Sequence, residues 1–195
     1  MTLFCDENHI YRNEQGIIIP NVTSILQAEG FTDFSRVPVD VLKAAQDFGT
    51  NVHIACELAD KGTLEYETLS PGLLPPIEAW CKFLEDYQAE IIEIERVVYS
   101  KIWHFCGTLD RVLKIKGKNG IYDIKTGEGC SLQTAAYKVA LDEECPDLKV
   151  KERAAVRLFP DGTYRIIPHD DKSEESLFKS IVKVHNSRKN YVKGA

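Results

Sequence analysis

The stretch GTLDRVLKIKGKNGIYDIKTG, residues 107–127, determines the fold that we expect for this chain. Two apolar runs flank the turn sequence KGKNG, which predicts two antiparallel strands joined by a tight turn. Asp110 lies in the first run, and Asp123 and Lys125 lie in the second. Since side chains alternate across a strand, Asp123 and Lys125 share one face, and Asp110 can approach Asp123 from the neighbouring strand. Burying these charges costs free energy unless they meet water, an opposite charge or a metal ion.

The facing aspartates favour a metal site. Two carboxylates repel each other unless positive charge lies between them, and a divalent cation with oxygen ligands supplies that charge. Lys125 adds a point charge suited to an anion or to an attacking water. A metal and a lysine at one place favour phosphoester hydrolysis. The alternative is a surface hairpin in which Lys125 bridges one of the aspartates, an arrangement that contributes little to stability.

Helical and strand patterns surround this hairpin. Apolar periodicity and turn residues predict helices in residues 21–30, 39–62, 77–87 and 131–141, and from Ser173 onward. Strands are predicted in residues 9–20 (two, around a turn at 13–16), 93–103, 104–115, 120–126 and 153–168 (a hairpin). One face of the second helix is expected to be buried, at Leu42, Ala45, Gly49, Val52, Cys56 and Ala59. The middle of the chain therefore reads helix, three strands, helix and strand.

Four short motifs occur in order along the chain. They are FGTNVH at residues 48–53, GTLD at 107–110, DIK at 123–125 and QTAAY at 133–137. In this order they resemble the Gly-x-x-x-His, Gly-x-x-Asp, Asp-x-Lys and Gln-x-x-x-Tyr motifs of the PD-(D/E)XK nuclease superfamily, in its RecB-like and phage-exonuclease branch. The first aspartate lacks the proline of the superfamily name, but this branch commonly has Gly-x-x-Asp there.

The resemblance spans most of the chain and implies its fold. We expect one α/β domain over residues 1–195 with a restriction-endonuclease-like core, whose order is helix, three strands, helix and strand. The central sheet is expected to be mixed, with helical additions on the N-terminal side and a helix on the C-terminal side. The catalytic residues that the resemblance implies are Lys125, Asp110, Asp123, Gln133 and Tyr137, and the metal ligands are His53, Asp110, Asp123 and Ile124.

Spacing within the helices adds to this set. Glu57 follows His53 by four residues, so the two share a helix face and Glu57 can add a ligand to the same metal. Gln133 and Tyr137 have the same spacing and can hydrogen-bond a phosphate or hold the Asp-x-Lys strand. Gly49 inside a helix costs roughly 1 kcal/mol relative to alanine, which close backbone approach to the site or to its substrate would explain.

The resemblance implies a metal-dependent DNA nuclease that uses Mg²⁺ or Mn²⁺. The expected activity is that of an exonuclease in phage or prophage DNA replication, recombination or repair, with Glu95 supporting the site. The expected partners are DNA with a single-stranded region or an end, together with phage recombination or replication proteins. Lys101, Lys114 and Lys116 are the candidate phosphate contacts. Two alternatives remain: a structure-specific endonuclease on the same fold, and a catalytically silent module that binds DNA or protein.

Composition narrows the classes of protein. The net charge of -6 opposes a protein that coats nucleic acid nonspecifically, but it is compatible with a local basic path. Six scattered cysteines without a CxxC pair predict reduced thiols. An iron-sulfur variant of the family has a close cysteine triple after the core, and no cysteine follows Cys145, so no cluster is expected. Without a signal segment or a spanning apolar run, we expect a cytoplasmic protein with no membrane contact.

Overall fold

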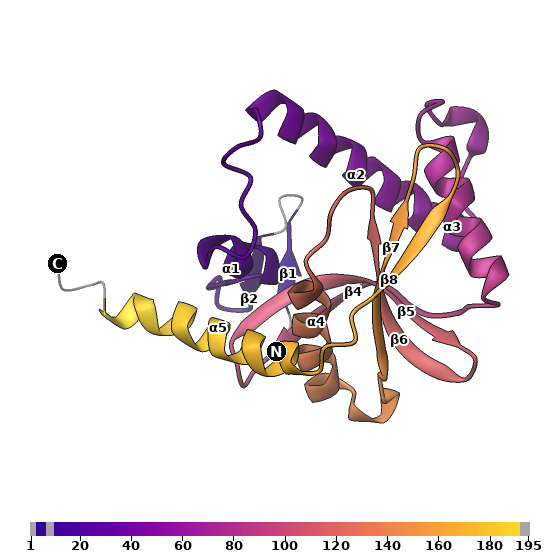
Figure 1. The fold of residues 1–195 in the computed structure, drawn as a ribbon. Coiled ribbons are helices and arrows are strands. Elements are labelled where there is room, and N and C mark those ends of the chain that lie inside the picture. The colour runs from indigo at the N-terminus through magenta and orange to yellow at the C-terminus, as the bar shows by residue number, and fades with distance from the viewer. Residues whose placement is uncertain (1–2, 7–9, 192–195) are drawn as a thin grey trace.

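The computed structural model describes residues 3–6 and 10–191, and a mixed five-stranded sheet lies at its centre (Figure 1). The strand order is β4-β5-β6-β7-β8, in which β6 and β7 are parallel and the other neighbours are antiparallel. The bounds are Glu90–Ser100 for β4, Phe105–Ile115 for β5, Lys118–Lys125 for β6, Glu152–Leu158 for β7 and Tyr164–Pro168 for β8. The chain is thus an α/β protein, as the sequence predicts.

The β5–β6 turn is shorter than the predicted KGKNG turn. Only Lys116 and Gly117 lie outside the strands, with φ values of 50° and 77°, which are the left-handed values that a two-residue hairpin loop requires. Ile115 pairs with Lys118, so Asn119 and Gly120 belong to the strand. A Cβ on Gly120 would lie 2.8 Å from the Tyr122 ring, which explains a glycine inside this strand.

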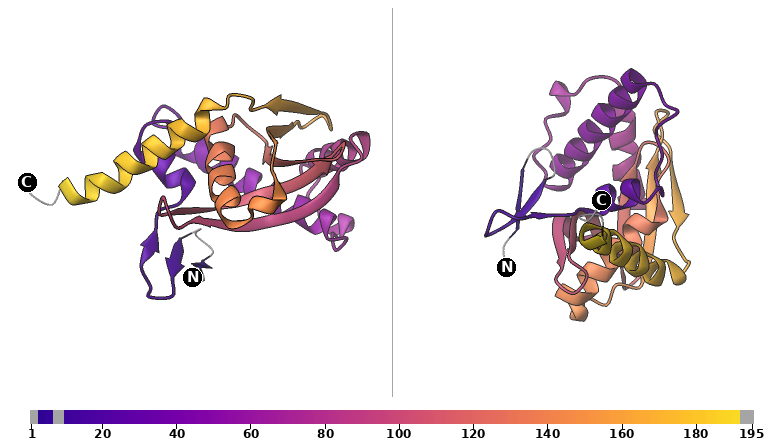
Figure 2. Two further views of the ribbon diagram at one scale, coloured as in Figure 1. Left: turned by 90° about the horizontal axis from the view of Figure 1, so that it is seen from below. Right: turned by 90° about the vertical axis from the view of Figure 1, so that its left-hand side faces the viewer.

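Five α-helices cover the two faces of the sheet within the described residues. They are α1 (Val22–Ala28), α2 (Val39–Asp60), α3 (Leu74–Asp86), α4 (Ser131–Glu144) and α5 (Ser173–Tyr191), with short 3₁₀ turns at Tyr66–Thr68 and Pro146–Leu148. Helices α1, α4 and α5 lie on one face, and α2 and α3 lie on the other (Figure 2). Helix α4 connects the parallel strands β6 and β7, which need such a crossover.

Each face has its own apolar core. On the α4 side, Phe105 of β5 packs edge-on against Phe178 of α5, with ring centroids 5.0 Å apart. On the α3 side, Phe83 is fully buried and contacts the rings of Trp80 and Tyr122 at 5.3 Å and 5.9 Å. The predicted periodicity of this helix is confirmed at Ile77 and Trp80, which are fully buried.

A small antiparallel sheet docks on the end of β5. It contains β1 (Leu3–Cys5), β2 (Tyr11–Asn13) and β3 (Ile18–Ile19), and so confirms the two strands predicted around residues 13–16, although residue 9 lies outside the described residues. The Tyr11 hydroxyl hydrogen-bonds Thr108 Oγ1 at 2.7 Å. Cys106 N donates to Pro20 O at 3.0 Å. These bonds fix the chain that leads into α1.

The buried face predicted for α2 is wrong in the first half of the helix. Ala45 is exposed and Val39 is 83% exposed, whereas Val52, Ala55 and Cys56 are buried. In Figure 1 the first half of α2 extends beyond the sheet and α3. Periodicity shows that a helix has an apolar face, but it does not show whether another element covers that face.

Two further expectations concern cysteines and membranes. Cys56, Cys81, Cys106, Cys130 and Cys145 are free thiols. Among the residues that the structure describes, none of the helices combines the length and the apolar character needed to cross a bilayer.

Candidate metal centre

The β5–β6 hairpin brings Asp110, Asp123 and Lys125 together. Lys125 Nζ lies 2.7 Å from Asp123 Oδ2. Asp110 Oδ2 accepts a hydrogen bond from Ile124 N at 2.6 Å, so the two strands are joined at the site itself. Both aspartates are buried, at 7% and 2% exposure. The arrangement is therefore a buried acidic site, and not the solvent-exposed ion pair of a surface hairpin.

Two more elements add ligands around Asp110. His53 of α2 places its Nδ1 3.5 Å from Asp110 Oδ1. Glu95 of β4 joins them, and one donor atom from each of His53, Glu95 and Asp110 lies within 4.8 Å of the others. One imidazole and two carboxylates form a ligand set suited to ions such as Mn²⁺. Glu95, predicted to support the site, stands here as a candidate ligand.

The pKa values of the three carboxyl groups are shifted in different directions, although burial raises each of them. Burial raises the pKa of Asp123 to about 6, with help from the charge of Asp110 and against the attraction of Lys125. Burial and the Asp110 charge likewise raise the pKa of Glu95 to about 7. For Asp110, burial is outweighed by His53, Lys125 and the Ile124 N–H, which hold its pKa well below the usual value. Asp110 is therefore ionised, whereas the attraction of Lys125 for Asp123 and of Arg111 for Glu95 does not outweigh burial.

The surroundings of the Asp123 carboxylate indicate whether the site fits a cation. Both of its carboxylate oxygens are buried and accept no hydrogen bond from the described residues, and the contact with Lys125 is an ion pair without hydrogen-bond geometry. A buried carboxylate is destabilising where its cationic partner does not offset the cost of burial, as the raised pKa of Asp123 indicates. A divalent cation beside it would remove that cost, so the residues present fit such an ion.

Helix α4 closes one side of the site. Gln133 Nε2 donates to the Tyr137 hydroxyl at 2.9 Å, and Tyr137 is 4% exposed. Burial, followed by the charge of Asp123, raises the pKa of Tyr137. A Cβ on Gly107 would lie 2.7 Å from Tyr137 Cε1, so the glycine of the GTLD motif makes room for this ring.

Three residues that were predicted at or near the site do not add a side chain to the group of candidate ligands. Glu57 pairs with Lys61 at 2.5 Å and does not join the His53 group. Ile124 contributes its backbone N–H to Asp110, while its side chain is buried in the α3-side core. A Cβ on Gly49 would lie 3.5 Å from Thr126 Oγ1, an ordinary contact, so packing within the chain does not require glycine there.

The sequence motifs do not include Arg111 and Asp60, which the structure brings to the site. Arg111 Nε donates to Asp60 Oδ2 at 2.6 Å, and Arg111 Nη1 donates to Glu95 Oε1 at 2.9 Å. The side chains of Arg111 and Asp60 are 0% and 1% exposed. One signal was available: Asp60 follows His53 by seven residues, so the two lie on one helix face.

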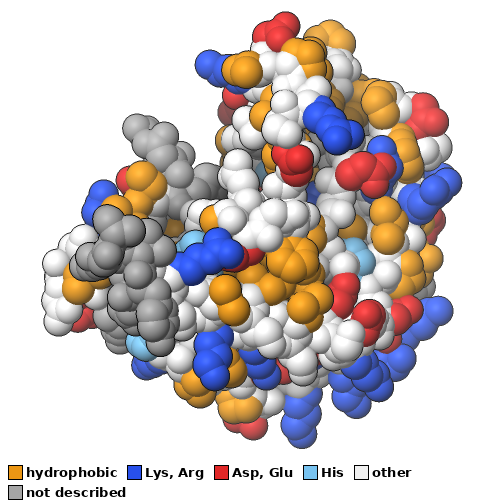
Figure 3. Space-filling view, turned by 60° about the vertical axis from the view of Figure 1, so that its left-hand side comes forward, with side chains coloured by type: hydrophobic (Ala, Val, Ile, Leu, Met, Phe, Trp, Pro, Cys, Tyr) orange, Lys and Arg blue, Asp and Glu red, His pale blue; other side chains and the backbone are white. Residues whose placement is uncertain are grey.

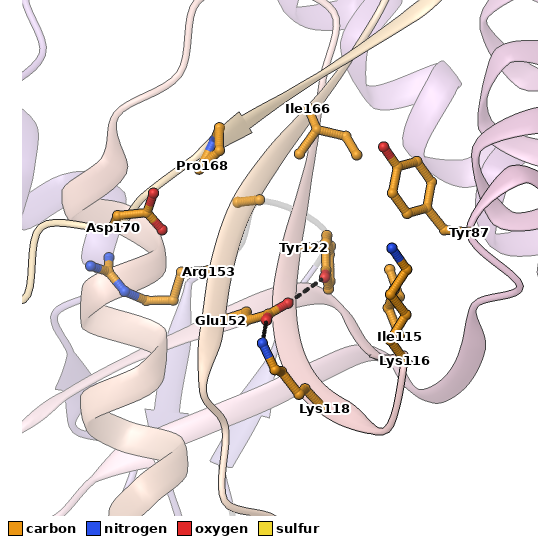
Figure 4. Close-up of a pocket in the computed structure, with 11 residues that line it drawn as sticks. Tyr87, Ile115, Lys116, Lys118, Tyr122, Glu152, Arg153, Ile166, Pro168 and Asp170 are labelled. Carbon is orange, nitrogen blue, oxygen red and sulfur yellow. Dashed lines mark hydrogen bonds and ion pairs between the residues drawn. The ribbon is translucent and has the colours of Figure 1, made fainter.

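A separate hollow lies near the turn of the β5–β6 hairpin (Figure 4). Its volume is about 540 Å³, and Tyr87, Tyr122 and Lys116 are among its lining residues. Lys118 and Tyr122 both contact Glu152 there, at 2.8 Å and 3.4 Å. None of the metal-site residues lines this hollow, so it is distinct from the candidate metal centre.

No protein-family profile matches this sequence, and no curated protein matches it. The fold and the site define an α/β protein with a partly buried group of His53, Glu95 and Asp110 that could hold a metal.

Proposed function

We propose that this protein is a metal-dependent deoxyribonuclease with the restriction-endonuclease-like core of the PD-(D/E)XK superfamily. The element order supports the proposal, because helix α3 precedes β4, β5 and β6, and α4 then leads to the parallel strand β7. The observation that carries it is the meeting of Asp110, Asp123 and Lys125, in which Lys125 forms an ion pair with the buried Asp123 carboxylate at 2.7 Å but does not offset the cost of its burial.

The residues have separate tasks in phosphodiester hydrolysis. A bound divalent cation would neutralise phosphate charge and lower the pKa of an attacking water. Burial alone would lower the pKa of Lys125, but Asp123 and Asp110 outweigh it and raise that pKa, so the ammonium group is charged and can orient water or a phosphate oxygen. The Tyr137 hydroxyl accepts from Gln133 and keeps its own proton to donate at the edge of the site.

DNA would bind through local charge. On the face shown in Figure 3, Lys and Arg side chains are interspersed with Asp and Glu and form no continuous basic surface. Lys114, a candidate phosphate contact, pairs with Glu90 at 3.0 Å, while Lys101 and Lys116 are exposed. Few phosphate contacts give weak nonspecific binding that falls further with salt. Weak nonspecific binding of this kind favours DNA substrates that enter the site by a strand end.

Helix α2 supports the exonuclease form of the proposal. It forms a wall beside the site and reaches the acidic group through His53. A wall on one side admits a thin strand end more readily than the middle of a rigid duplex. A cytoplasmic role in phage DNA replication, recombination or repair, beside phage proteins, rests on the motif resemblance.

Incubation with end-labelled linear DNA, with Mn²⁺, Mg²⁺ or EDTA, tests the proposal. We expect metal-dependent release of label, which Lys125→Ala abolishes and the exposed-site control Lys172→Ala preserves. Loss of covalently closed single-stranded circles at the same rate would favour the endonuclease alternative. Binding of DNA with no cleavage under any of these metals would favour the silent module.

A further inference from the structure

Arg111 contacts several groups beside the metal site through its guanidinium. Its Nε binds Asp60 at 2.6 Å, and its Nη1 binds both the Glu95 carboxylate at 2.9 Å and the Asp110 carbonyl at 2.6 Å. Trp80 Nε1 donates to Asp60 Oδ1 at 2.9 Å, and the guanidinium lies 5.7 Å from the centre of the Trp80 ring. The guanidinium is thus fixed on one side and contacts two candidate ligand residues on the other.

Glu95 adopts a backbone conformation that needs support. Its φ is 45°, although it is not glycine and lies inside β4. This left-handed conformation costs about 1–3 kcal/mol, so the surrounding contacts must impose it. Ile94 pairs with Arg111 and Arg96 pairs with Leu109, which places Glu95 opposite Asp110. Arg111 therefore hydrogen-bonds the side chain of a residue, Glu95, whose backbone is strained.

We propose that Arg111 is a positioning residue of the metal centre, which holds the Glu95 carboxylate toward His53 and Asp110. The inference rests on the proposed function for its metal and extends it by assigning a task to a residue outside the motifs. Arg111 Nη2 is buried without an acceptor among the described residues, which is a cost for the fold. A role of Arg111 in orienting the ligands would account for a buried donor that has this cost for the fold.

The charges around the site predict opposite changes in cation affinity for loss of the Arg111 charge and for loss of its positioning role. With every carboxyl group ionised and His53 neutral, as metal binding requires, Asp60, Glu95, Asp110 and Asp123 face two cations, Arg111 and Lys125, which leaves two negative charges for a divalent ion. Removing the charge of Arg111 would strengthen cation binding by electrostatics alone. Arg111→Lys keeps the charge and removes the planar fork of donors, so a loss of affinity in this variant reports positioning.

The experiment is a double-mutant cycle with Mn²⁺ binding as the readout, measured by calorimetry. Arg111→Lys should weaken Mn²⁺ binding about 10- to 100-fold, as loss of a residue that orients a ligand does. In the Glu95→Gln background the same change should weaken binding less than about 3-fold, because Arg111 acts through Glu95. A role in the fold alone would produce the same loss in both backgrounds.

Arg153→Lys is the matched control. Arg153 of β7 is also buried and paired, with Glu174 at 3.0 Å, and its other contacts, which include those with Ser131 and Thr134, are not with a candidate ligand. The control should lower thermal stability and leave Mn²⁺ affinity unchanged. Circular dichroism reports folding, and if Arg111→Lys does not fold, Asp60→Asn takes its place in the cycle because it loosens the guanidinium from behind.

Three results would overturn the inference: unchanged affinity in Arg111→Lys, equal losses in both backgrounds, or no Mn²⁺ binding by the wild-type protein. The first two leave the proposed nuclease function intact. Coupled Mn²⁺ binding in a protein that cleaves no DNA would instead support the positioning role and refute the nuclease.

Discussion

Neutralising Asp123 should stabilise the metal-free protein. The Asp123 carboxylate is buried, accepts no hydrogen bond from the described residues and lies near the negative charge of Asp110. Replacing it with asparagine keeps the shape and removes the charge. We therefore expect Asp123→Asn to unfold at a higher urea concentration than wild type at pH 8 in EDTA, although the change removes a residue that the proposed reaction needs.

The magnitude follows from the pKa of Asp123. That pKa is about 6 in the folded protein against 3.8 ordinarily, with the attraction of Lys125 already included. A difference of about two units corresponds to about 3 kcal/mol. Because the folded pKa is raised, bound protons stabilise the fold below pH 4, and this stability is lost as pH rises through 6. The gain from Asp123→Asn should thus be about 3 kcal/mol at pH 8 and about 1 kcal/mol at pH 4.5.

Urea unfolding of both proteins at pH 8 and pH 4.5 measures this difference. The exposed Asp147→Asn serves as control and should change the free energy of unfolding by less than about 0.5 kcal/mol. Saturating Mn²⁺ should stabilise wild type selectively and so reverse the order at pH 8. The reasoning is refuted if Asp123→Asn is the less stable protein at pH 8 in EDTA, or if its gain does not depend on pH.

Further predictions concern packing, metal choice, catalysis and substrate. Gly107→Ala should lower the free energy of urea unfolding by about 1–3 kcal/mol through its clash with Tyr137, and an equal loss in the Tyr137→Leu background would contradict that cause. His53→Ala should reduce the preference for Mn²⁺ over Mg²⁺ in calorimetry; an unchanged preference would remove His53 from the ligands. Lys125→Ala should bind Mn²⁺ and fold but not cleave end-labelled DNA, and retained cleavage would reject its role. Linear single strands should be degraded while closed circles of the same sequence survive in gel assays, and equal loss would reject the exonuclease.

The β5–β6 hairpin could be predicted because its signals are local. Alternation fixes which side chains share a face, and a short turn fixes the pairing of adjacent strands, so Asp110 and Asp123 could be brought together from sequence. The exact turn was harder, because Asn119 and Gly120 are turn-forming residues that instead pair within the strand. The order of helices and strands followed from periodicity in the same way.

Glu95 and Arg111 could not be assigned their contacts from sequence. Their meeting depends on how β4 pairs with β5, and that pairing contains an irregularity between Ile91 and Glu93 that no local pattern marks. The choice between Glu57 and Asp60 on α2 depends on the rotation of the helix. Tertiary contacts set that rotation, and they bring Asp60 to the buried guanidinium.

The half-packed helix α2 has a consequence for motion. Its first half, residues 39–51, contains no buried side chain, and burial begins at Val52, immediately before His53. Amide hydrogens ahead of Val52 should therefore exchange with deuterated water through local fraying, while those after it exchange only when the helix leaves the sheet. His53 follows this boundary, so opening of the first half leaves the imidazole beside Asp110, and the histidine disengages only when Val52 leaves the core.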